Sequence, residues 1–349
     1  MTVSYHLHLA SVSSLTFLHV LFRWKGSVWK QIYKELLVWI TTFLIISLFY
    51  RYLLSNQHKT IFEKLIKYFN DRLNYIPTTF ILGFFVHIIL SRWSAIFHNM
   101  GYIESYALFT SNYISGTDLE SKVLRETIAR YMCLTQVLVF RDISISVRKR
   151  FPNIDSIINA GIITVEEKKI LDIIKLQYNK YWVPIRWIHN IAQVARDQQR
   201  ITNDIMYCKL LNQFRHDLQL LCNYDWVPLP LVYTQAVFLA IYVYFFVCLL
   251  SRQFISNNEV SFFKLDLIIP IMTTIQFIFY TGWLKIAQAL INPFGDDDDD
   301  FECNYLIDKN ITVRYYYNYD YTVKRLSFLQ TCNSNNRHSC ANTTCILFN

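Results

Sequence analysis

The sequence from Leu229 to Leu250, LPLVYTQAVFLAIYVYFFVCLL, contains no charged residue. Crossing a hydrocarbon core of ~30 Å takes roughly 20 apolar residues in a helix, so this run predicts a membrane-spanning helix. The run from Leu267 to Leu284 is also free of charge. Two N-terminal runs, Leu36 to Leu54 and Ile76 to Leu90, are shorter or interrupted but predict a further pair. The sequence therefore predicts an all-α integral membrane protein with four transmembrane segments in two pairs.

The composition of the 349-residue chain agrees with a lipid environment. It is 53% hydrophobic and 17% aromatic but only 17% charged, which lies outside the usual range of soluble domains. The net charge of +8 favours anchoring to the lipid bilayer over nucleic acid, because the basic residues gather beside apolar runs, at Arg23 to Lys34 and Arg148 to Arg150. The eight cysteines show no CxxC or paired Cys/His spacing, so we expect neither a zinc site nor a disulfide framework.

The segment between the two membrane pairs carries charges every few residues among apolar ones, which is typical of a soluble helical layer. The positive-inside rule places this segment and the N-terminal arm in the cytosol, so both termini are expected there. Glycosylation patterns at Asn310 and Asn342 should then stay unmodified. The predicted organisation is a cytosolic arm over 1–35, a first transmembrane pair over 36–90, a cytosolic helical region over 91–228, a second pair over 229–285, an acidic segment over 286–312 and a tail over 313–349.

The run from Asn292 to Glu302, NPFGDDDDDFE, directly follows the last apolar run. An acidic run alone is most often a solvated stretch. Here the proline and glycine before the aspartates predict a turn that holds the carboxylates near the membrane face. Calcium prefers six to eight oxygen ligands from carboxylates and carbonyls. Asn292 offers a side-chain carbonyl, and Asp297 and Asp300 are three residues apart, so the run predicts a calcium site.

The same aspartates permit an enzymatic interpretation. Asp296 to Asp300 matches the Asp-Asp-x-x-Asp pattern with which prenyltransferases hold magnesium and a diphosphate. Such enzymes normally need a second acidic motif on a facing helix, and the sequence contains no comparable aspartate cluster. It contains no nucleophile motif either. We therefore expect a protein without catalytic residues, with a membrane-embedded prenyltransferase as the alternative.

Ile76, Phe80 and Phe84 recur every four residues in the second apolar run. On a helix they form a single stripe, which is most often ordinary packing. Repeated around a symmetry axis, such a stripe forms a hydrophobic constriction that gates by dewetting. Phenylalanine edges carry positive potential and tolerate an anion better than a cation. His87 in the same run is open to two interpretations, an ion or proton site and a histidine used in helix packing.

Several motifs resemble the bestrophin family in their order and spacing. The most specific is the run from Asn292 to Glu302; the others are RWKGSVWK at 23–30, IPTTFILGF at 76–84, YWVP at 181–184, YDW at 224–226, PLVYTQ at 230–235 and GWLK at 282–285. The resemblance covers the chain as far as about Thr312. It implies a homopentamer around one central anion pore in the plasma membrane, which conducts chloride as the main anion and is activated by cytosolic Ca2+.

The resemblance also implies roles for particular residues. By position these are a pore neck of Ile76, Phe80 and Phe84, a cytosolic aperture at Ile205, and calcium ligands from the side chains of Asn292, Asp297 and Asp300 and the backbone carbonyl of Ala10.

The sequence departs from the family pattern in several places. Ala289 stands where the family has a glutamine that adds a ligand oxygen, so the calcium affinity or ligand number is expected to differ. Ser94 replaces the second Trp of the usual Arg-Trp-Trp. After Thr312 the chain bears little resemblance to the long family tail that contributes to inactivation, so gating is expected to differ. A non-conducting membrane scaffold or accessory subunit is the second alternative to a channel.

Overall fold

The computed structural model describes residues 14–175, 179–201, 203–254 and 270–312. Every regular element in these residues is a helix, which confirms the predicted all-α class. The chain divides into two compact units. The first draws on residues up to Ala95 and from Val227 to Phe301, and the second on Ile96 to Trp226 and from Glu302 onward.

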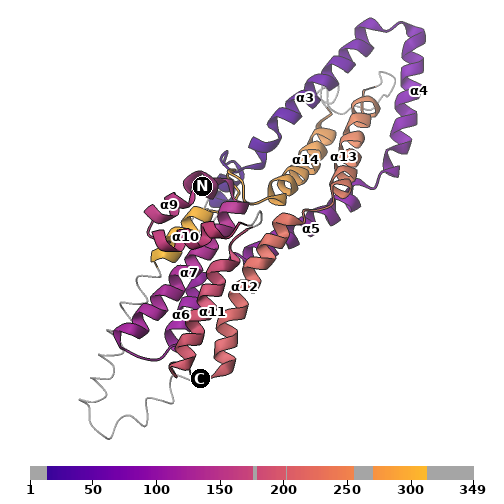
Figure 1. Cartoon of the computed structure of the whole chain (residues 1–349). Helices are drawn as coiled ribbons and strands as arrows, with labels where there is room; N and C mark the ends of the chain where they lie inside the picture. The colour runs from indigo at the N-terminus through magenta and orange to yellow at the C-terminus, as the bar shows by residue number, and fades with distance from the viewer. Residues whose placement is uncertain (1–13, 176–178, 202, 255–269, 313–349) are drawn as a thin grey trace. The chain divides into compact units, whose positions relative to one another are not determined.

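The first unit holds the four predicted apolar runs, on α3, α5, α13 and α14. Within it, α14 packs on α3, and α13 packs on α3, α4 and α14 (Figure 1). Its elements are α2 (Ser14–Leu21), α3 (Val28–Leu48), the π-helical turn η1 (Phe49–Leu53), α4 (Asn56–Arg72), the 3-10 turn η2 (Leu73–Tyr75), α5 (Thr78–His98, whose last turn belongs to the second unit), α13 (Leu231–Ser251) and α14 (Ile271–Ile291).

Among the described residues, three helical stretches are long and apolar enough to cross a membrane: Val28–Leu53, Thr78–Tyr113 and Leu231–Ser251. α14 falls outside this group, although it has the same 21-residue length as α13. It carries Lys285, whose Nζ lies 2.5 Å from Glu35 Oε1 on α3. The connection predicted between the first two spans is itself helical, because η1, α4 and η2 fill it.

An aromatic cluster joins α3, α13 and α14. Trp39 of α3 donates its indole N–H to the backbone oxygen of Phe245 on α13, at 3.1 Å. The ring centroid of Phe277 on α14 lies 5.2 Å from that of Trp39 and 4.8 Å from that of Phe245. All three side chains are buried. Because van der Waals packing and interhelical hydrogen bonds hold membrane helices together, this cluster fixes the three helices against one another.

The N-terminal arm turns sharply into α3. Gly26 has a φ of 67°, in the left-handed region that glycine enters without a steric penalty. Ser27 caps the helix, because its side chain accepts a hydrogen bond from the backbone N–H of Lys30. Lys30 is therefore held in the first turn of α3.

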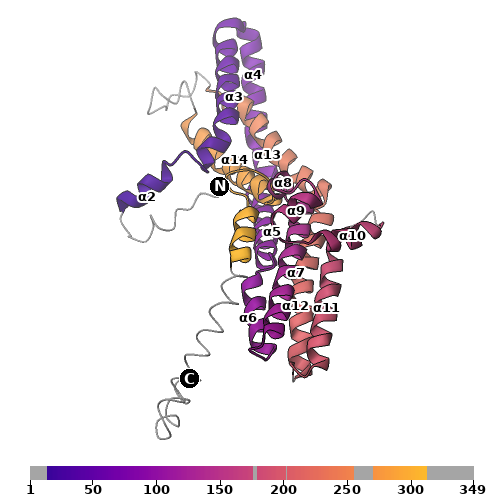
Figure 2. The ribbon, with the colours of Figure 1, turned by 60° about the vertical axis from the view of Figure 1, so that its left-hand side comes forward.

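The second unit is a helical bundle around α7. Its elements are α6 (Ile103–Tyr113), α7 (Leu119–Ile143), α8 (Ile145–Arg150), α9 (Ile154–Asn159), α10 (Val165–Ile173), α11 (Trp182–Asp197) and α12 (Asp204–Trp226). α7 packs on α6, α8, α11 and α12, and the four long helices α6, α7, α11 and α12 run side by side in Figures 1 and 2. From Met132 to Phe140 every residue of α7 is buried, as a central helix requires.

An ion pair fastens the short helix α10 to α7. Arg130 of α7 donates from Nη1 and Nη2 to the two carboxylate oxygens of Glu167, each at 2.7 Å. Glu167 also completes a capping box with Thr164. Burial would raise the pKa of Glu167, but hydrogen bonds from Arg130 and Tyr131 outweigh it and hold that pKa at about 2.

Residues 303–312 form a helical segment of the second unit, although the sequence grouped them with the acidic run. Asn310 donates from Nδ2 to Gln136 Oε1 at 2.8 Å, and Arg150 lies 2.6 Å from Asp308. Asn310 is 2% exposed. A glycan on this buried amide would require local unfolding, which supports the prediction that Asn310 is unmodified. Asn342 lies outside the described residues.

Candidate functional site

The acidic run folds into a closed turn directly after α14. Asn292 ends the helix in an extended conformation. The backbone N–H of Phe301 donates to Pro293 O at 2.8 Å, and that of Asp300 to Asp297 O at 3.3 Å. These bonds bring the two ends of the aspartate run together. The run is therefore a folded structure, as its proline and glycine predicted, and not a solvated stretch.

Asp300 is the buried acid of this turn. It is 7% exposed, and its Oδ2 accepts a hydrogen bond from the backbone N–H of Asp297 at 2.7 Å. Burial raises the pKa of Asp300, and the neighbouring carboxylates of Asp297, Asp299 and Asp296 raise it further. Negative charge is therefore concentrated around a carboxylate that water reaches poorly.

The other proposed calcium ligands lie around the same turn. Asn292 and Asp297 are exposed, and Asn292 Oδ1 accepts a hydrogen bond from the backbone N–H of Phe294 at 3.4 Å. In the part of the chain that the structure describes, no three acidic, histidine or cysteine side chains converge as a metal cluster. Ala10 lies outside the described residues. The carboxylate and amide oxygens present are the hard ligands that calcium prefers, and the excess negative charge fits a divalent cation.

An ion pair links the acidic turn to the N-terminal arm. Lys30 Nζ of α3 lies 2.6 Å from Asp298 Oδ2. This hydrogen bond from Lys30 lowers the pKa of Asp298, and a backbone hydrogen bond from Gly26 lowers it further. The first turn of α3 and the acidic turn are therefore held together, although 268 residues separate the two partners.

An aromatic contact links the same turn to α5. The ring centroid of Phe301 lies 5.1 Å from that of Trp93 on α5 and 5.9 Å from that of Phe294 in the turn. Arg92 donates to the backbone oxygen of Val227 at 3.0 Å. The acidic turn is therefore in contact with the C-terminal half of α5 through packed rings.

One face of α5 carries the predicted neck residues. Phe80 and Phe84 are 66% and 54% exposed, and their ring centroids are 4.6 Å apart. On the opposite face Phe85 and Val86 are buried in the core of the first unit. Ile76 precedes the helix in an extended conformation, so the predicted three-residue helical stripe is wrong at this residue. Phe80 and Phe84 alone share the helical register.

Ile205, the predicted aperture residue, lies in the first turn of α12. Its side chain is 76% exposed, and its backbone N–H donates to Asn203 Oδ1 at 2.8 Å. Ile205 is in the second unit and the neck and acidic turn are in the first.

A family model described as "Bestrophin, RFP-TM, chloride channel" matches residues 1–318. The chain belongs to the bestrophin family. Bestrophin homolog 22 of Caenorhabditis elegans is 45% identical to it over 315 residues, which are 89% of this chain and 63% of that protein. Human Bestrophin-3 is 43% identical over 317 residues, 90% of this chain and 48% of that protein. The chain thus spans between about half and two thirds of the length of these bestrophins.

Solved bacterial bestrophin structures share the fold. One point mutant of a bacterial bestrophin homolog from Klebsiella pneumoniae superposes with a TM-score of 0.63 over 83% of this chain and 99% of that one, at 15% identity. A second point mutant of the same homolog gives a TM-score of 0.61 over 82% and 99%, also at 15% identity. The family match and the apolar helices together support the predicted membrane protein.

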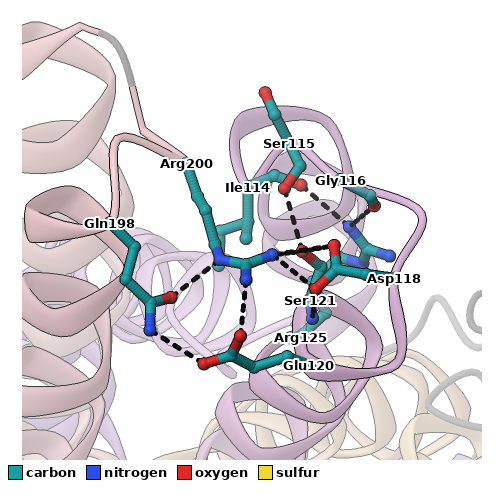
Figure 3. A network of polar contacts seen from close by, with 9 residues as sticks. All are labelled: Ile114, Ser115, Gly116, Asp118, Glu120, Ser121, Arg125, Gln198 and Arg200. Atoms are coloured by element: carbon teal, nitrogen blue, oxygen red, sulfur yellow. Dashed lines mark hydrogen bonds and ion pairs between the residues drawn. The ribbon is translucent and has the colours of Figure 1, made fainter.

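A polar network that the sequence did not predict holds the turn before Ile205, the predicted aperture residue (Figure 3). Arg200 lies between α11 and α12 and donates from Nη1 to both oxygens of Asp118 at 2.8 Å and from Nη2 to Glu120 Oε2 at 2.6 Å. Its backbone oxygen accepts from Ser115 N at 2.9 Å. Hydrogen bonds from Ser121 and Arg200 lower the pKa of Asp118.

The same network has an unusual backbone and a buried cation. Gln199, just before Arg200, has a φ of 56°, in a region that side-chain-bearing residues rarely adopt. Arg125 of α7 is buried and donates to the backbone oxygens of Ile114 and Gly116 at 2.9 and 3.0 Å. The α6–α7 loop and the turn between α11 and α12 are therefore fixed to each other.

Proposed function

We propose that this bestrophin is a calcium-gated anion channel, with chloride as the main ion, built as a homopentamer in the plasma membrane with both termini cytosolic. Membership of the family supports a channel. The observation that carries the calcium gating is the closed acidic turn, which is tied to α3 through Lys30 and to α5 through Trp93.

The calcium site in this proposal consists of oxygens from Asn292, Asp297 and Asp300 and the backbone carbonyl of Ala10. When bound, calcium supplies a divalent charge that offsets the repulsion among the aspartates. The hydrogen bond from the Asp297 backbone N–H would hold the Asp300 carboxylate in place as a ligand. Because Phe301 is the next residue and packs on Trp93, a shift of the turn on calcium binding would be transmitted to α5.

The gate in this proposal is the neck formed by Phe80 and Phe84 of each subunit, with Ile76 at its outer end. Apolar side chains around a narrow pore exclude water, so a small rotation of α5 opens or closes the permeation path. Changing the open-to-closed ratio of the gate from 1:99 to 99:1 needs about 5.5 kcal/mol of differential calcium-binding free energy. This is ~1.1 kcal/mol for each of five sites acting together. Weak calcium sites therefore suffice. Ile205 forms a second constriction at the cytosolic aperture.

Recording from purified protein in planar bilayers tests this function. We expect chloride current that rises with cytosolic calcium, and a calcium response shifted to higher concentration by Asp300→Ala. Asp172→Ala, which removes an exposed acid on α10, is the matched control and should leave the response unchanged. A current that does not depend on calcium, or an unshifted calcium response in Asp300→Ala, would contradict the calcium assignment.

The two alternatives make distinct predictions in the same preparation. A non-conducting scaffold or accessory subunit would show a ring-shaped or other assembly without halide current. A prenyltransferase would turn over an isoprenyl diphosphate in the presence of magnesium. The sequence has a single acidic motif where that reaction needs two, and the family match favours a channel.

A further inference from the structure

We propose that His87 and Ser91 of α5 form an anion-contacting site in the pore, directly cytosolic to the two phenylalanines of the neck. The ligand is a small, partly hydrated anion such as chloride. This inference rests on the proposed function, because it takes Phe80 and Phe84 as the face of α5 that lines the permeation path.

The helical register places these residues on that face. His87 follows Phe80 by seven residues and Phe84 by three, and Ser91 follows His87 by four. At 3.6 residues per turn, seven residues complete nearly two turns, and residues three or four apart are neighbours on one side of a helix. The stripe therefore changes from aromatic to polar within two turns of α5.

The burial pattern separates this face from the packed one. His87 and Ser91 are both exposed, whereas Phe85, Val86 and Ile89 are buried in the core of the first unit. His87 is thus not buried in the core of the first unit, which favours the ion-site interpretation.

The environment of a membrane helix restricts what this face contacts. Within the described residues, no hydrogen bond or ion pair joins the side chain of His87 or Ser91 to another residue. A polar side chain in a span is costly against lipid and is found facing other helices or a water-filled path. Since the same face carries Phe80 and Phe84, the water-filled path of the proposed channel accounts for both the aromatic and the polar residues.

The chemistry of the two side chains suits an anion. An imidazole always keeps at least one N–H donor, and a serine hydroxyl can donate its O–H. Donors of this kind replace part of the hydration shell of an ion in a pore. One such pair from each subunit would surround the ion just after it passes the neck.

Cysteine substitution with charged thiol reagents tests the site. In membrane patches opened by calcium, a positively charged methanethiosulfonate applied from the cytosolic side to His87→Cys should raise the unitary chloride conductance, and a negatively charged one should lower it. A unit charge about 6 Å from the ion in water-like surroundings changes the local anion concentration by roughly threefold, and high salt should reduce the effect. Ser91→Cys should respond in the same direction.

Two controls make the result specific. Val86→Cys places the thiol on the buried face and should not respond. The unsubstituted chain, which already has the exposed Cys208, defines the background. Unitary conductance does not depend on how many channels reach the membrane, so variants that express poorly can still be compared.

Conservative and non-conservative replacements give an independent measurement. His87→Gln keeps an N–H donor and should retain most of the unitary conductance, whereas His87→Leu should lower it several-fold. If Phe84→Cys responds to the reagents but His87→Cys does not, and His87→Leu conducts normally, the site is refuted and the proposed channel stands. If the unsubstituted chain carries no anion current, the proposed function fails and the site fails with it.

Discussion

Replacing Gly295 by alanine would test the calcium turn without removing any ligand. A Cβ atom at this position would lie 2.6 Å from Asp300 Oδ2, whereas ordinary contact begins at 3.4 Å. The φ of Gly295 is not in the left-handed region, so an alanine backbone is tolerated and the carboxylate of Asp300 must move by about 0.8 Å, the difference between those two distances. In a metal site the distance between a ligand atom and the metal varies by only about 0.2 Å from its expected value.

The magnitude follows from the hydrogen bond that this movement breaks. Asp300 Oδ2 accepts from Asp297 N at 2.7 Å, and a hydrogen bond to a charged group contributes about 1.5 to 3 kcal/mol. If about 1.4 kcal/mol of this is lost from calcium binding, the half-activating calcium concentration rises about tenfold. Titrating cytosolic calcium on inside-out patches measures the shift.

A double-mutant cycle shows whether the effect passes through Asp300. With Asp300→Ala in place, the added methyl group meets no carboxylate, so Gly295→Ala should shift the calcium response no further, to within about 0.5 kcal/mol. An equal shift in both backgrounds would refute the reasoning, because it would mean that alanine acts through the backbone. An unshifted response in Gly295→Ala alone would mean that the position of the Asp300 carboxylate is unimportant.

Three further predictions concern other parts of the chain. Replacing Phe80 and Phe84 together by alanine should leave current in calcium-free solution, because the apolar barrier is lost; unchanged gating would make these residues packing groups. Arg200→Gln should change anion permeability ratios in the same direction as Ile205→Ala, because it loosens the turn before α12. A lower melting temperature without a permeability change would mean that Arg200 contributes only to stability. Glu167→Gln should lower the free energy of unfolding by about 3 kcal/mol near neutral pH, since the pKa of Glu167 falls from 4.5 to about 2 on folding. This difference should fade as the pH falls from about 4.5 to about 2, as melting curves in detergent would show; a difference constant down to pH 2 would contradict it.

The class of the protein and its apolar helices follow from local sequence. The uncharged run from Leu229 to Leu250 is long enough to span a membrane wherever it lies in the fold, and α13 covers most of it. The closed shape of the acidic run was also predictable, because proline and glycine restrict the backbone locally. The limit of such reasoning appears at Ile76, which lies before Pro77. A residue before proline is biased toward extended conformations, so the helical spacing counted from Phe80 does not reach it.

Contacts between distant residues were decided by the tertiary structure alone. Lys30 and Asp298 are 268 residues apart and Arg200 and Asp118 are 82 apart, and no periodicity in the sequence relates such partners. The role of His87 depends in the same way on which side of α5 the core covers. The sequence by itself determined which segments form apolar helices and where the acidic turn lies, because these depend on composition and local turns. Only the packed helices decided which faces are buried and which charges meet, because those depend on the arrangement of all the segments at once.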